Sequence, residues 1–340
     1  MIRLSDHIAA AGGWLSLEAF MQLALHHPQE GYYSSSIENI GQRGDFSTTP
    51  TLSPILAKAI VAHWKEACSR CGRRLPLLEI GAGSGALAVK ILERLGFWNR
   101  LNTDYVIVES SPRLREFQHL LLGGRAKIYS TMEKALKHCG GKAFIFSNEL
   151  VDAFPARVFE YTEQDWKEVG LVVKNGAVRE ELRPVRQQPL FSHMLEYGSQ
   201  PGQRVVIHDS YARWFTSWLP HWNMGVMTVI DYGDEMERLY YRRPRGSLRG
   251  YKSHQVLTGE ELYRNPGLTD LTCDVNFTDL LELSRNCLGD RVTFMTQRDY
   301  LLPHAENTPQ DAFLTDEYGA GGHFHVLIQE RQRLQPEGTQ

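Results

Sequence analysis

The chain lacks the features of secreted, membrane-spanning and nucleic-acid-binding proteins. It has only five cysteines in 340 residues, an odd and scattered set that makes no disulfide framework and favours a reducing compartment. With 37 Lys and Arg against 40 Asp and Glu, it has no electropositive field to hold phosphate backbones. No apolar run is long enough to cross a bilayer, and Asp6 and His7 stand where a signal peptide would become apolar. We therefore expect a cytoplasmic protein of bacterial type, without signal or transit peptide, that neither enters a membrane nor binds nucleic acid.

Two short patterns have the appearance of metal sites. Cys68 and Cys71 have the spacing of half a zinc site, but no second close cysteine pair follows. The apolar residues around them recur at helical intervals, so we interpret them as cysteines at a helix end. His323 and His325 alternate as on a strand, without a nearby cysteine or carboxylate cluster, and are interpreted as structural. We expect no metal site.

Short apolar runs alternate with segments of helical spacing along much of the chain. At 340 residues the chain is about twice the size of a usual domain, which predicts two domains or one domain with a large insertion. The alternation predicts an α/β fold, a Rossmann-like parallel sheet with helices on both faces. Strands are predicted at 75–80, 104–109, 126–129, 143–147, 227–231, 291–295 and 323–329, and helices at 15–25, 52–70, 86–95 and 211–219.

A glycine-rich turn after the first of these strands is the strongest signal in the sequence. Gly81, Gly83 and Gly85 let the chain turn sharply and let backbone N–H groups approach a ligand. Glu79 lies just before them, where a carboxylate repels a pyrophosphate and attracts an ammonium group. An amino-acid-like ligand is favoured. The glycines followed by Ala86 also satisfy the dinucleotide pattern Gly-x-Gly-x-x-Ala, which leaves an NAD-linked oxidoreductase open.

Acidic residues end two further strands of the predicted sheet. Glu109 ends the second strand, where folds of this type hold ribose hydroxyls with an acid. Asn148, Glu149 and Asp152 follow the fourth strand, at the edge where parallel sheets carry their chemistry. The two carboxylates fit a cationic acceptor such as a guanidinium or ammonium group. The alternative is a helix N-terminus that carries acids for capping and dipole reasons.

The loop of residues 40–50 is a second candidate element. Gly44 and Pro50 interrupt it, and Asp45, Ser47 and Thr48 have side chains that order loops by local hydrogen bonds. We expect it either to fold over the ligand or to form a capped entry into the next helix.

With these residues the chain resembles the class I S-adenosylmethionine-dependent methyltransferases. In that family the first acid lies near the methionine moiety of the cofactor, the glycines pass beneath it, and the second acid holds the ribose. The resemblance implies a seven-stranded sheet whose last strand is antiparallel, with S-adenosyl-L-methionine as the cofactor. Because its sulfonium is already a good leaving group, the protein must mainly position the acceptor and exclude water. The cofactor-binding residues implied are Glu79, Gly81, Ala82, Gly83, Gly85, Glu109, Ser110, Asn148, Asp45 and Thr48.

Ordered motifs narrow the resemblance to the MidA-like family of methyltransferases, which includes the mitochondrial protein arginine methyltransferases that assist respiratory complex I assembly. The motifs are Gly31-Tyr32-Tyr33, Gly44-Asp45-Phe46, Asn148 to Pro155, Asp231-Tyr232-Gly233, Arg249-Gly250-Tyr251 and Asp270 to Phe277. The chain departs from the family at Asp274-Val275-Asn276-Phe277, where His-Val-Asp-Phe is more usual, and at Ser47 to Pro50, where Tyr/Val-Thr-Ser-Pro is more usual. We expect these departures to affect acceptor chemistry more than cofactor binding.

The resemblance implies an enzyme that methylates a protein side chain, with arginine as the acceptor and a respiratory NADH dehydrogenase subunit as an example of the partner. Glu149 and Asp152 are then the catalytic residues: Glu149 pairs with the acceptor cation and Asp152 supports it. A different class of function stays open, an assembly factor that binds the cofactor for stability and acts by holding a partner.

Antiparallel strand patterns interrupt the predicted core after residue 155. Runs at 158–161, 166–173 and 177–182 read as a meander with a Lys174-Asn175-Gly176 turn. We expect an N-terminal helical segment with the cofactor-covering loop at 1–74 and the methyltransferase core at 75–155 and 204–335, with a loop insertion at 234–280. The inserted meander, at 156–203, is predicted to be the acceptor or partner region.

Overall fold

The protein is described by a computed structural model over residues 2–36, 53–252 and 255–331. The chain forms two compact units and passes between them several times. The first unit comprises Met1–Asn39, Val151–Trp214 and Tyr232–Leu283, and the second Ile40–Leu150, Phe215–Asp231 and Ser284–Gln340. In the described part of the chain, no helix is long and apolar enough to cross a membrane.

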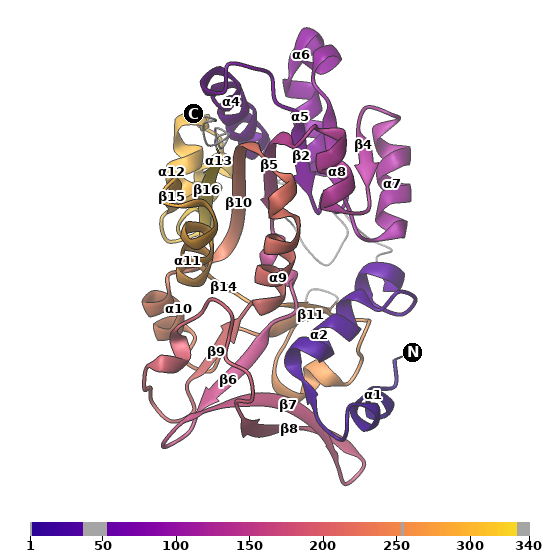
Figure 1. The fold of residues 1–340 in the computed structure, drawn as a ribbon, viewed down its shortest axis with the longest axis vertical. Helices are drawn as coiled ribbons and strands as arrows, with labels where there is room; N and C mark the ends of the chain where they lie inside the picture. The colour runs from indigo at the N-terminus through magenta and orange to yellow at the C-terminus, as the bar shows by residue number, and fades with distance from the viewer. Residues whose placement is uncertain (1, 37–52, 253–254, 332–340) are drawn as a thin grey trace, which may run out of the picture. The chain divides into compact units, whose positions relative to one another are not determined.

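A mixed sheet is the centre of the second unit (Figure 1). Strands β4, β3, β2, β5 and β10 are neighbours in that order and run parallel. Strand β16 follows β10, and β15 pairs antiparallel with β16. This mixed α/β architecture confirms the predicted fold class. The strands are β2 (Leu77–Ile80), β3 (Tyr105–Val108), β4 (Lys127–Tyr129), β5 (Lys142–Asn148), β10 (Met224–Asp234), β15 (Val292–Thr296) and β16 (Phe324–Arg331).

Helices α4, α5, α12 and α13 bury their apolar residues in one core with side chains of this sheet. In α4, Ile55, Leu56, Ile60 and Trp64 are buried at the helical spacing read from the sequence. The helices of this unit are α4 (Ile55–Arg70), α5 (Ala86–Arg94), α6 (Gly96–Asn102), α7 (Pro112–Leu122), α8 (Met132–His138), η4 (Leu219–His221), α12 (Gln297–Leu301), η6 (Leu302–His304), α13 (Pro309–Leu314) and α14 (Ala320–His323). Helices α9 (Asp209–Trp218) and α11 (Phe277–Leu288) contain residues of both units.

The first unit contains an antiparallel sheet in the order β1-β7-β6-β9, with β8 paired to β7. Its strands β6 to β8 confirm the predicted meander, and Asn175 and Gly176 form the turn between β7 and β8 with φ of 52° and 75°. The short strand β9 pairs with β6, so this sheet extends past residue 203. The strands are β1 (Leu15–Ser16), β6 (Arg157–Tyr161), β7 (Trp166–Lys174), β8 (Ala177–Pro184) and β9 (Arg204–Ile207).

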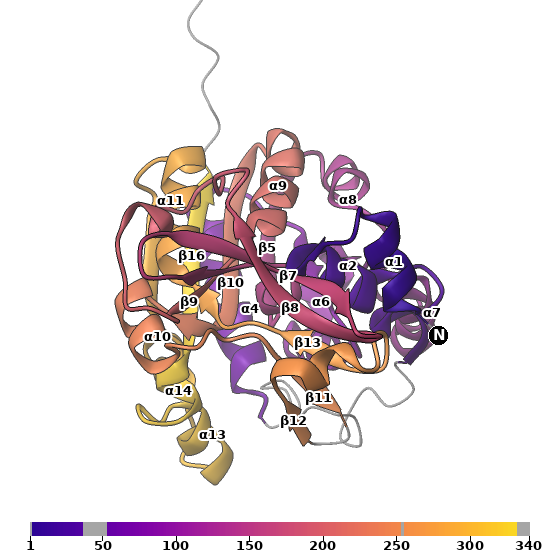
Figure 2. The same ribbon diagram turned by 90° about the horizontal axis from the view of Figure 1, so that it is seen from below.

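Helices α1 and α2 lie against this sheet (Figure 2), and they share an apolar core with β6, β7 and β9. A small second sheet, β12-β11-β13, also belongs to the first unit. The remaining elements are α1 (Leu4–Ala10), α2 (Leu17–His26), η1 (Tyr32–Ser36), η2 (Val151–Ala153), η3 (Met194–Glu196), α10 (Met236–Arg242), β11 (Arg249–Lys252), β12 (Gln255–Leu257), η5 (Gly259–Tyr263), β13 (Asp270–Thr272) and β14 (Val275–Asn276). The roles expected for these parts of the chain stay predictions: a cofactor-covering segment at 1–74, an acceptor or partner region at 156–203, and a methyltransferase core at 75–155 and 204–335.

Cys68 and Cys71 lie at the end of α4, as the sequence predicts. Burial raises the pKa of both thiols, which makes them poor nucleophiles. His325 is buried on β16, where its ring stacks on Phe294 at a centroid distance of 5.1 Å. Over residues 2–36, 53–252 and 255–331, no group of three His, Cys, Asp or Glu side chains is arranged to hold a metal ion.

Candidate functional site

The glycine turn closes the end of β2 against its two neighbouring strands. The N–H of Gly81 donates to the carbonyl of Val108 over 2.8 Å, and the N–H of Gly85 donates to the carbonyl of Ala82 over 2.7 Å. The glycines at 81, 83 and 85 have φ of 67°, 52° and 72°, a region that disfavours residues with a Cβ atom. A Cβ on Gly81 would also lie 2.7 Å from Cδ1 of Leu150. The positive φ at residue 81 therefore favours glycine, and a larger residue there would also displace the end of the Leu150 side chain.

Gly83 differs from the other two glycines because its surroundings are open. No described atom lies within 4 Å of the place that a Cβ of residue 83 would take, whereas a Cβ on Gly85 would lie 3.1 Å from Cδ2 of Leu121. The backbone at Gly83 is thus accessible to a ligand in a way that a side chain would prevent.

Glu79 is buried at the end of β2 and is bound to Tyr105 of β3. The Tyr105 hydroxyl donates to Oε2 of Glu79 over 2.6 Å. Burial, together with the nearby charge of Glu109, raises the pKa of Glu79 to about 7, although the Tyr105 hydrogen bond opposes this shift. Near neutral pH the carboxyl group is therefore poised between its two forms, and a cation beside it would draw it to the carboxylate.

Glu109 is held by its own loop and by helix α7. The N–H of Ser111 donates to Oε1 of Glu109 over 2.9 Å, and Nε2 of Gln118 donates to Oε2 over 3.4 Å. Burial raises the pKa of Glu109, while these two donors and Arg115 lower it. Ser110 is exposed, and its carbonyl accepts a hydrogen bond from Nη1 of Arg115 over 2.7 Å. The sequence analysis did not identify Gln118. Its position at helical spacing from the buried Leu114 and Leu122 of α7 is the signal that could have shown it.

Asn148 and Glu149 lie where β5 ends, and the following residue is tied to β10. Nδ2 of Asn148 donates to Oε1 of Glu149 over 3.0 Å, and the N–H of Glu149 donates to the carbonyl of Ile230 over 2.9 Å. The N–H of Leu150 donates to Oδ2 of Asp231 over 3.1 Å. Oδ1 of Asn148 is buried and makes no hydrogen bond within the described residues. Such a buried polar atom is a candidate ligand contact.

Glu149 adopts an unusual backbone conformation. In the part of the chain that the structure describes, only Glu149 and Asn175 are non-glycine residues with positive φ, and both have a φ of 52°. Asn175 occupies a hairpin turn, where asparagine tolerates this region, but glutamate has no such preference. A strained residue of this kind costs about 1–3 kcal/mol and persists where the surrounding structure imposes it, most often at functional sites.

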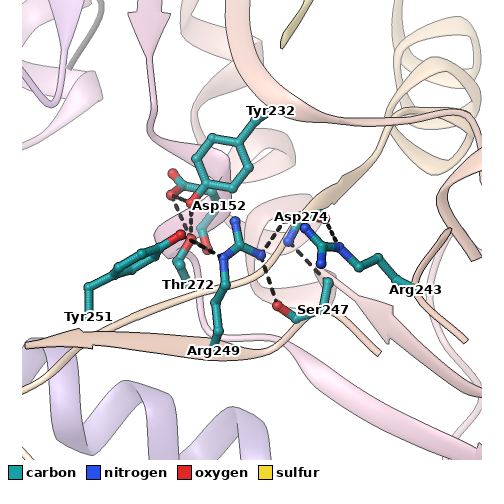
Figure 3. A network of polar contacts seen from close by, with 8 residues as sticks. All are labelled: Asp152, Tyr232, Arg243, Ser247, Arg249, Tyr251, Thr272 and Asp274. Atoms are coloured by element: carbon teal, nitrogen blue, oxygen red, sulfur yellow. Dashed lines mark hydrogen bonds and ion pairs between the residues drawn. The ribbon is translucent and has the colours of Figure 1, made fainter. Parts of the chain in front are cut away.

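Asp152, in the first unit, belongs to a network of polar side chains (Figure 3). Its Oδ2 accepts hydrogen bonds from the hydroxyl of Tyr232 and from Oγ1 of Thr272, the latter over 2.8 Å. The N–H of Cys273 donates to the backbone carbonyl of Asp152 over 3.0 Å. Burial raises the pKa of Asp152, whereas its two hydroxyl donors and the nearby Arg249 lower it. Asp152 is therefore a fixed member of a network.

Arg249 of β11 is the buried cation of this network. Its guanidinium lies over the rings of Tyr232 and Tyr251, 5.1 and 5.7 Å from their centroids, and Figure 3 shows Asp274 on its other side. Nη1 of Arg249 contacts Oδ1 of Asp274 at 2.5 Å and donates to the carbonyl of Ser247 over 3.0 Å. Asp274 also accepts from Nε of Arg243 over 3.1 Å. These contacts of Arg249 are not evident from the sequence alone, because arginines in loops are usually solvated.

The structure thus brings the predicted residues into two sets. Glu79, the glycine turn with Ala82, Glu109, Ser110, Asn148 and Glu149 lie at the carboxyl ends of neighbouring strands of the second unit, and Asp152 lies in the first unit. Asp45 and Thr48 lie outside the described residues. The parallel strand order, the glycine turn of β2 and the acid that follows β3 define a Rossmann-like nucleotide-binding fold, which is the fold expected of the class I S-adenosylmethionine-dependent methyltransferases.

Comparisons with known proteins agree with this class and narrow it. Residues 55–295 match the model of a family described as "Putative S-adenosyl-L-methionine-dependent methyltransferase". The chain belongs to this family, the MidA-like class I methyltransferases. Its cofactor is S-adenosyl-L-methionine, and the dinucleotide alternative is set aside.

Two curated relatives and one solved structure illustrate the similarity. The chain is 26% identical to the mitochondrial protein arginine methyltransferase NDUFAF7 of Xenopus tropicalis over 324 residues, which cover 85% of this chain and 71% of the relative. The Danio rerio protein of the same name is 27% identical over 332 residues, with 87% and 75% covered. A Burkholderia thailandensis protein, crystallised with S-adenosyl-homocysteine, superposes with a TM-score of 0.81 at 25% identity, covering 96% of this chain and 90% of that one.

Proposed function

We propose that this protein transfers a methyl group from S-adenosyl-L-methionine to an arginine side chain of a protein, and that Glu149 holds the acceptor. The observation that carries the proposal is the strained backbone of Glu149 at the carboxyl edge of β5. A glutamate kept in this conformation presents a carboxylate at the edge where parallel sheets carry their chemistry. The relatives named as protein arginine methyltransferases support the same acceptor.

The residues at the ends of β2, β3 and β5 fit the cofactor. A cation beside Glu79 would lower the raised pKa of its carboxyl group and favour the carboxylate. This carboxylate can then pair with the ammonium group of the methionine moiety. Gly83 leaves its backbone open to a ligand, and Glu109 offers an acidic group to the ribose hydroxyls. The buried Oδ1 of Asn148 makes no hydrogen bond within the described residues, so it can accept one from the cofactor. We assign the remaining backbone contacts to Gly81, Ala82, Gly85 and Ser110, and we keep Asp45 and Thr48 as predicted contacts.

The bound cofactor supplies an electrophilic methyl group on a sulfonium, so the chain's own residues need to align the acceptor and manage one proton. A guanidinium nitrogen that gains a methyl group loses one proton. The carboxylate of Glu149 orients the guanidinium by charge-assisted hydrogen bonds and accepts that proton. Asn148 restrains the Glu149 side chain through its 3.0 Å hydrogen bond. Within the first unit, Tyr232 and Thr272 donate hydrogen bonds to Asp152, and the supporting role of Asp152 toward the acceptor stays a prediction.

A direct test is a mass-spectrometric comparison of arginine methylation in cells with the protein, without it, and with Glu149→Ala. We expect at least one protein to carry methylarginine only where the unaltered enzyme is present, and subunits of respiratory NADH dehydrogenase are the partners to inspect first. Methyl groups on another residue type would show that arginine is not the acceptor, without contradicting S-adenosyl-L-methionine as the cofactor. If Glu149→Ala restored the cellular function without any methylation, the protein would act as an assembly factor.

Gly83→Ala tests the cofactor position with a matched control. We expect the added methyl group to weaken S-adenosyl-homocysteine binding by about 10-fold to 100-fold in calorimetric titration, because it fills the open space at the turn. Gly123, the C-cap of α7, has nearly the same φ, 55°, and equally open surroundings. Gly123→Ala should therefore show a similar loss of stability, about 1 kcal/mol, and unchanged binding. If the two variants bound S-adenosyl-homocysteine with equal affinity, Gly83 would not be part of the cofactor site.

A further inference from the structure

Gln118 links the glycine turn to the acid of β3. It lies on α7, and its side chain is fully buried. Its Nε2 donates to the carbonyl of Gly83 over 2.9 Å and to Oε2 of Glu109 over 3.4 Å. One amide nitrogen thus contacts two elements that are 26 residues apart in the sequence and that the proposed function assigns to the same cofactor.

Packing alone does not explain a glutamine at this position. Oε1 of Gln118 is buried and makes no hydrogen bond within the described residues, and such an atom costs about 1–3 kcal/mol. The opposite amide orientation would place this oxygen against two other acceptors, so the hydrogen-bond network fixes the assignment. A leucine or methionine would fill the same space without an unpaired oxygen, but it would leave the Gly83 carbonyl and Oε2 of Glu109 without this donor. The chain retains a costly side chain that makes two specific hydrogen bonds.

We propose that Gln118 is a positioning residue of the methyltransferase, which holds the Glu109 carboxylate and the Gly83 turn in the geometry that receives the ribose. This inference rests on the proposed cofactor site. Glu109 has Ser111 as the donor to its other oxygen, so the Gln118 amide fixes the rotation of the carboxylate. The same amide restrains the turn at the glycine whose backbone is open. Both elements are thereby preorganised, which reduces the entropy lost when the ligand binds.

The test measures binding of two ligands to Gln118→Met, which keeps the size of the side chain and removes both hydrogen bonds. We expect the affinity for S-adenosyl-homocysteine to fall about 10-fold or more. The affinity for its 2′,3′-dideoxy analogue, which has no ribose hydroxyls, should fall by less than about 3-fold, because only the restraint on the Gly83 turn is lost there and Glu109 has no hydroxyl to hold. In turnover assays the KM for S-adenosyl-L-methionine should rise by a similar factor, while kcat and the KM for the acceptor stay within about 3-fold.

Gln297 provides a matched control in the same unit. It is also fully buried, donates through Nε2 to a backbone carbonyl, that of Leu314, and also has a buried Oε1 without a described partner. Gln297→Met should therefore affect stability like Gln118→Met and leave both affinities unchanged. Gln118→Leu is the second variant if the first does not fold, because its side chain is apolar, close in size and without a donor for either acceptor.

The outcomes separate the inference from the proposed function. If Gln118→Met lowers the affinity for both ligands equally, or changes stability without changing affinity, Gln118 is structural and the inference is wrong. In that case Glu109→Ala still tests the proposed cofactor site. A large loss of S-adenosyl-homocysteine affinity would support Glu109 as a cofactor contact, and unchanged affinity would show that Glu109 does not contact the cofactor.

Discussion

Glu149→Gly is expected to lose methyl transfer and yet to be more stable than Glu149→Ala. Both variants lack the carboxylate, so kcat should fall by about 10²-fold or more, because the acceptor is no longer held in line. Alanine keeps the strained backbone with a φ of 52°, whereas glycine adopts it without a steric penalty. We expect glycine to be the more stable by about 1 kcal/mol in thermal or urea unfolding. The affinity for S-adenosyl-homocysteine should be unchanged in both.

Asn175 is the matched control for this experiment, because it has the same φ in a hairpin turn of the first unit. Asn175→Gly should leave methyl transfer unchanged and alter stability little, since asparagine already tolerates the conformation. If Glu149→Ala and Glu149→Gly retained methyl transfer, Glu149 would not hold the acceptor. Loss of S-adenosyl-homocysteine binding in a folded variant would move Glu149 to the cofactor.

Arg249→Met should destabilise the first unit by about 3–5 kcal/mol, which is the cost of removing one partner from a buried ion pair. The Arg249 side chain is only 14% exposed and Asp274 only 10%, so the Asp274 carboxylate would keep Arg243 alone as a charged partner. The Tyr232 and Tyr251 rings would also lose the cation that lies over them. The loss of unfolding free energy can be measured by urea unfolding, with hydrogen exchange of the β11 and β13 amides as the readout for the first unit.

The exposed pair of Arg179 and Glu260 is the control for Arg249. These side chains are 47% and 53% exposed, so Arg179→Met should change stability by at most about 1 kcal/mol. Combining Arg249→Met with Asp274→Asn should recover part of the loss, because the buried carboxylate that has lost its buried cation is then removed as well. If Arg249→Met cost no more than Arg179→Met, the network of Figure 3 would not be a buried charge network in solution.

Asp274 lies at one of the two places where the chain departs from its family. The usual histidine and aspartate at 274 and 276 are here Asp274 and Asn276, so the acid stands two residues earlier in the sequence. In this structure Asp274 forms ion pairs with both Arg249 and Arg243, and Oδ1 of Asn276 accepts a hydrogen bond from the N–H of Thr278 over 3.1 Å. The departure therefore falls on residues of the polar network around Arg249, and its effect on acceptor chemistry stays a prediction.

The sequence predicted the strands of the core closely, because each is a short apolar run bounded by turn residues. The predicted strand at 75–80 corresponds to β2, Leu77–Ile80, and the strand at 104–109 to β3, Tyr105–Val108. The glycines of the turn were also identified correctly, since their positive φ is a local requirement. These features depend on neighbours in the sequence, which pattern analysis can use.

The contacts that join distant segments could not be predicted in the same way. Gln118 bonds to Gly83 across 35 residues, and Thr272 bonds to Asp152 across 120 residues. The strand β9 has only four residues and is recognised by its pairing with β6. No local pattern says which inward polar side chain meets which partner. The positive φ of Glu149 is also not evident from the sequence, because the hydrogen bonds beside it, from Glu149 to Ile230 and from Leu150 to Asp231, join segments that are far apart in the chain.

The Leu150 side chain lies against the backbone of Gly81, so the turn assigned to the cofactor touches the residue that follows Glu149. A Cβ at residue 81 would lie 2.7 Å from Cδ1 of Leu150, an atom at the end of a flexible side chain that can move aside. Gly81→Ala would therefore act first through the φ of 67° at residue 81, and then on the packing beside Glu149. A substitution made to alter cofactor binding at this turn can thus also reach the proposed acceptor carboxylate.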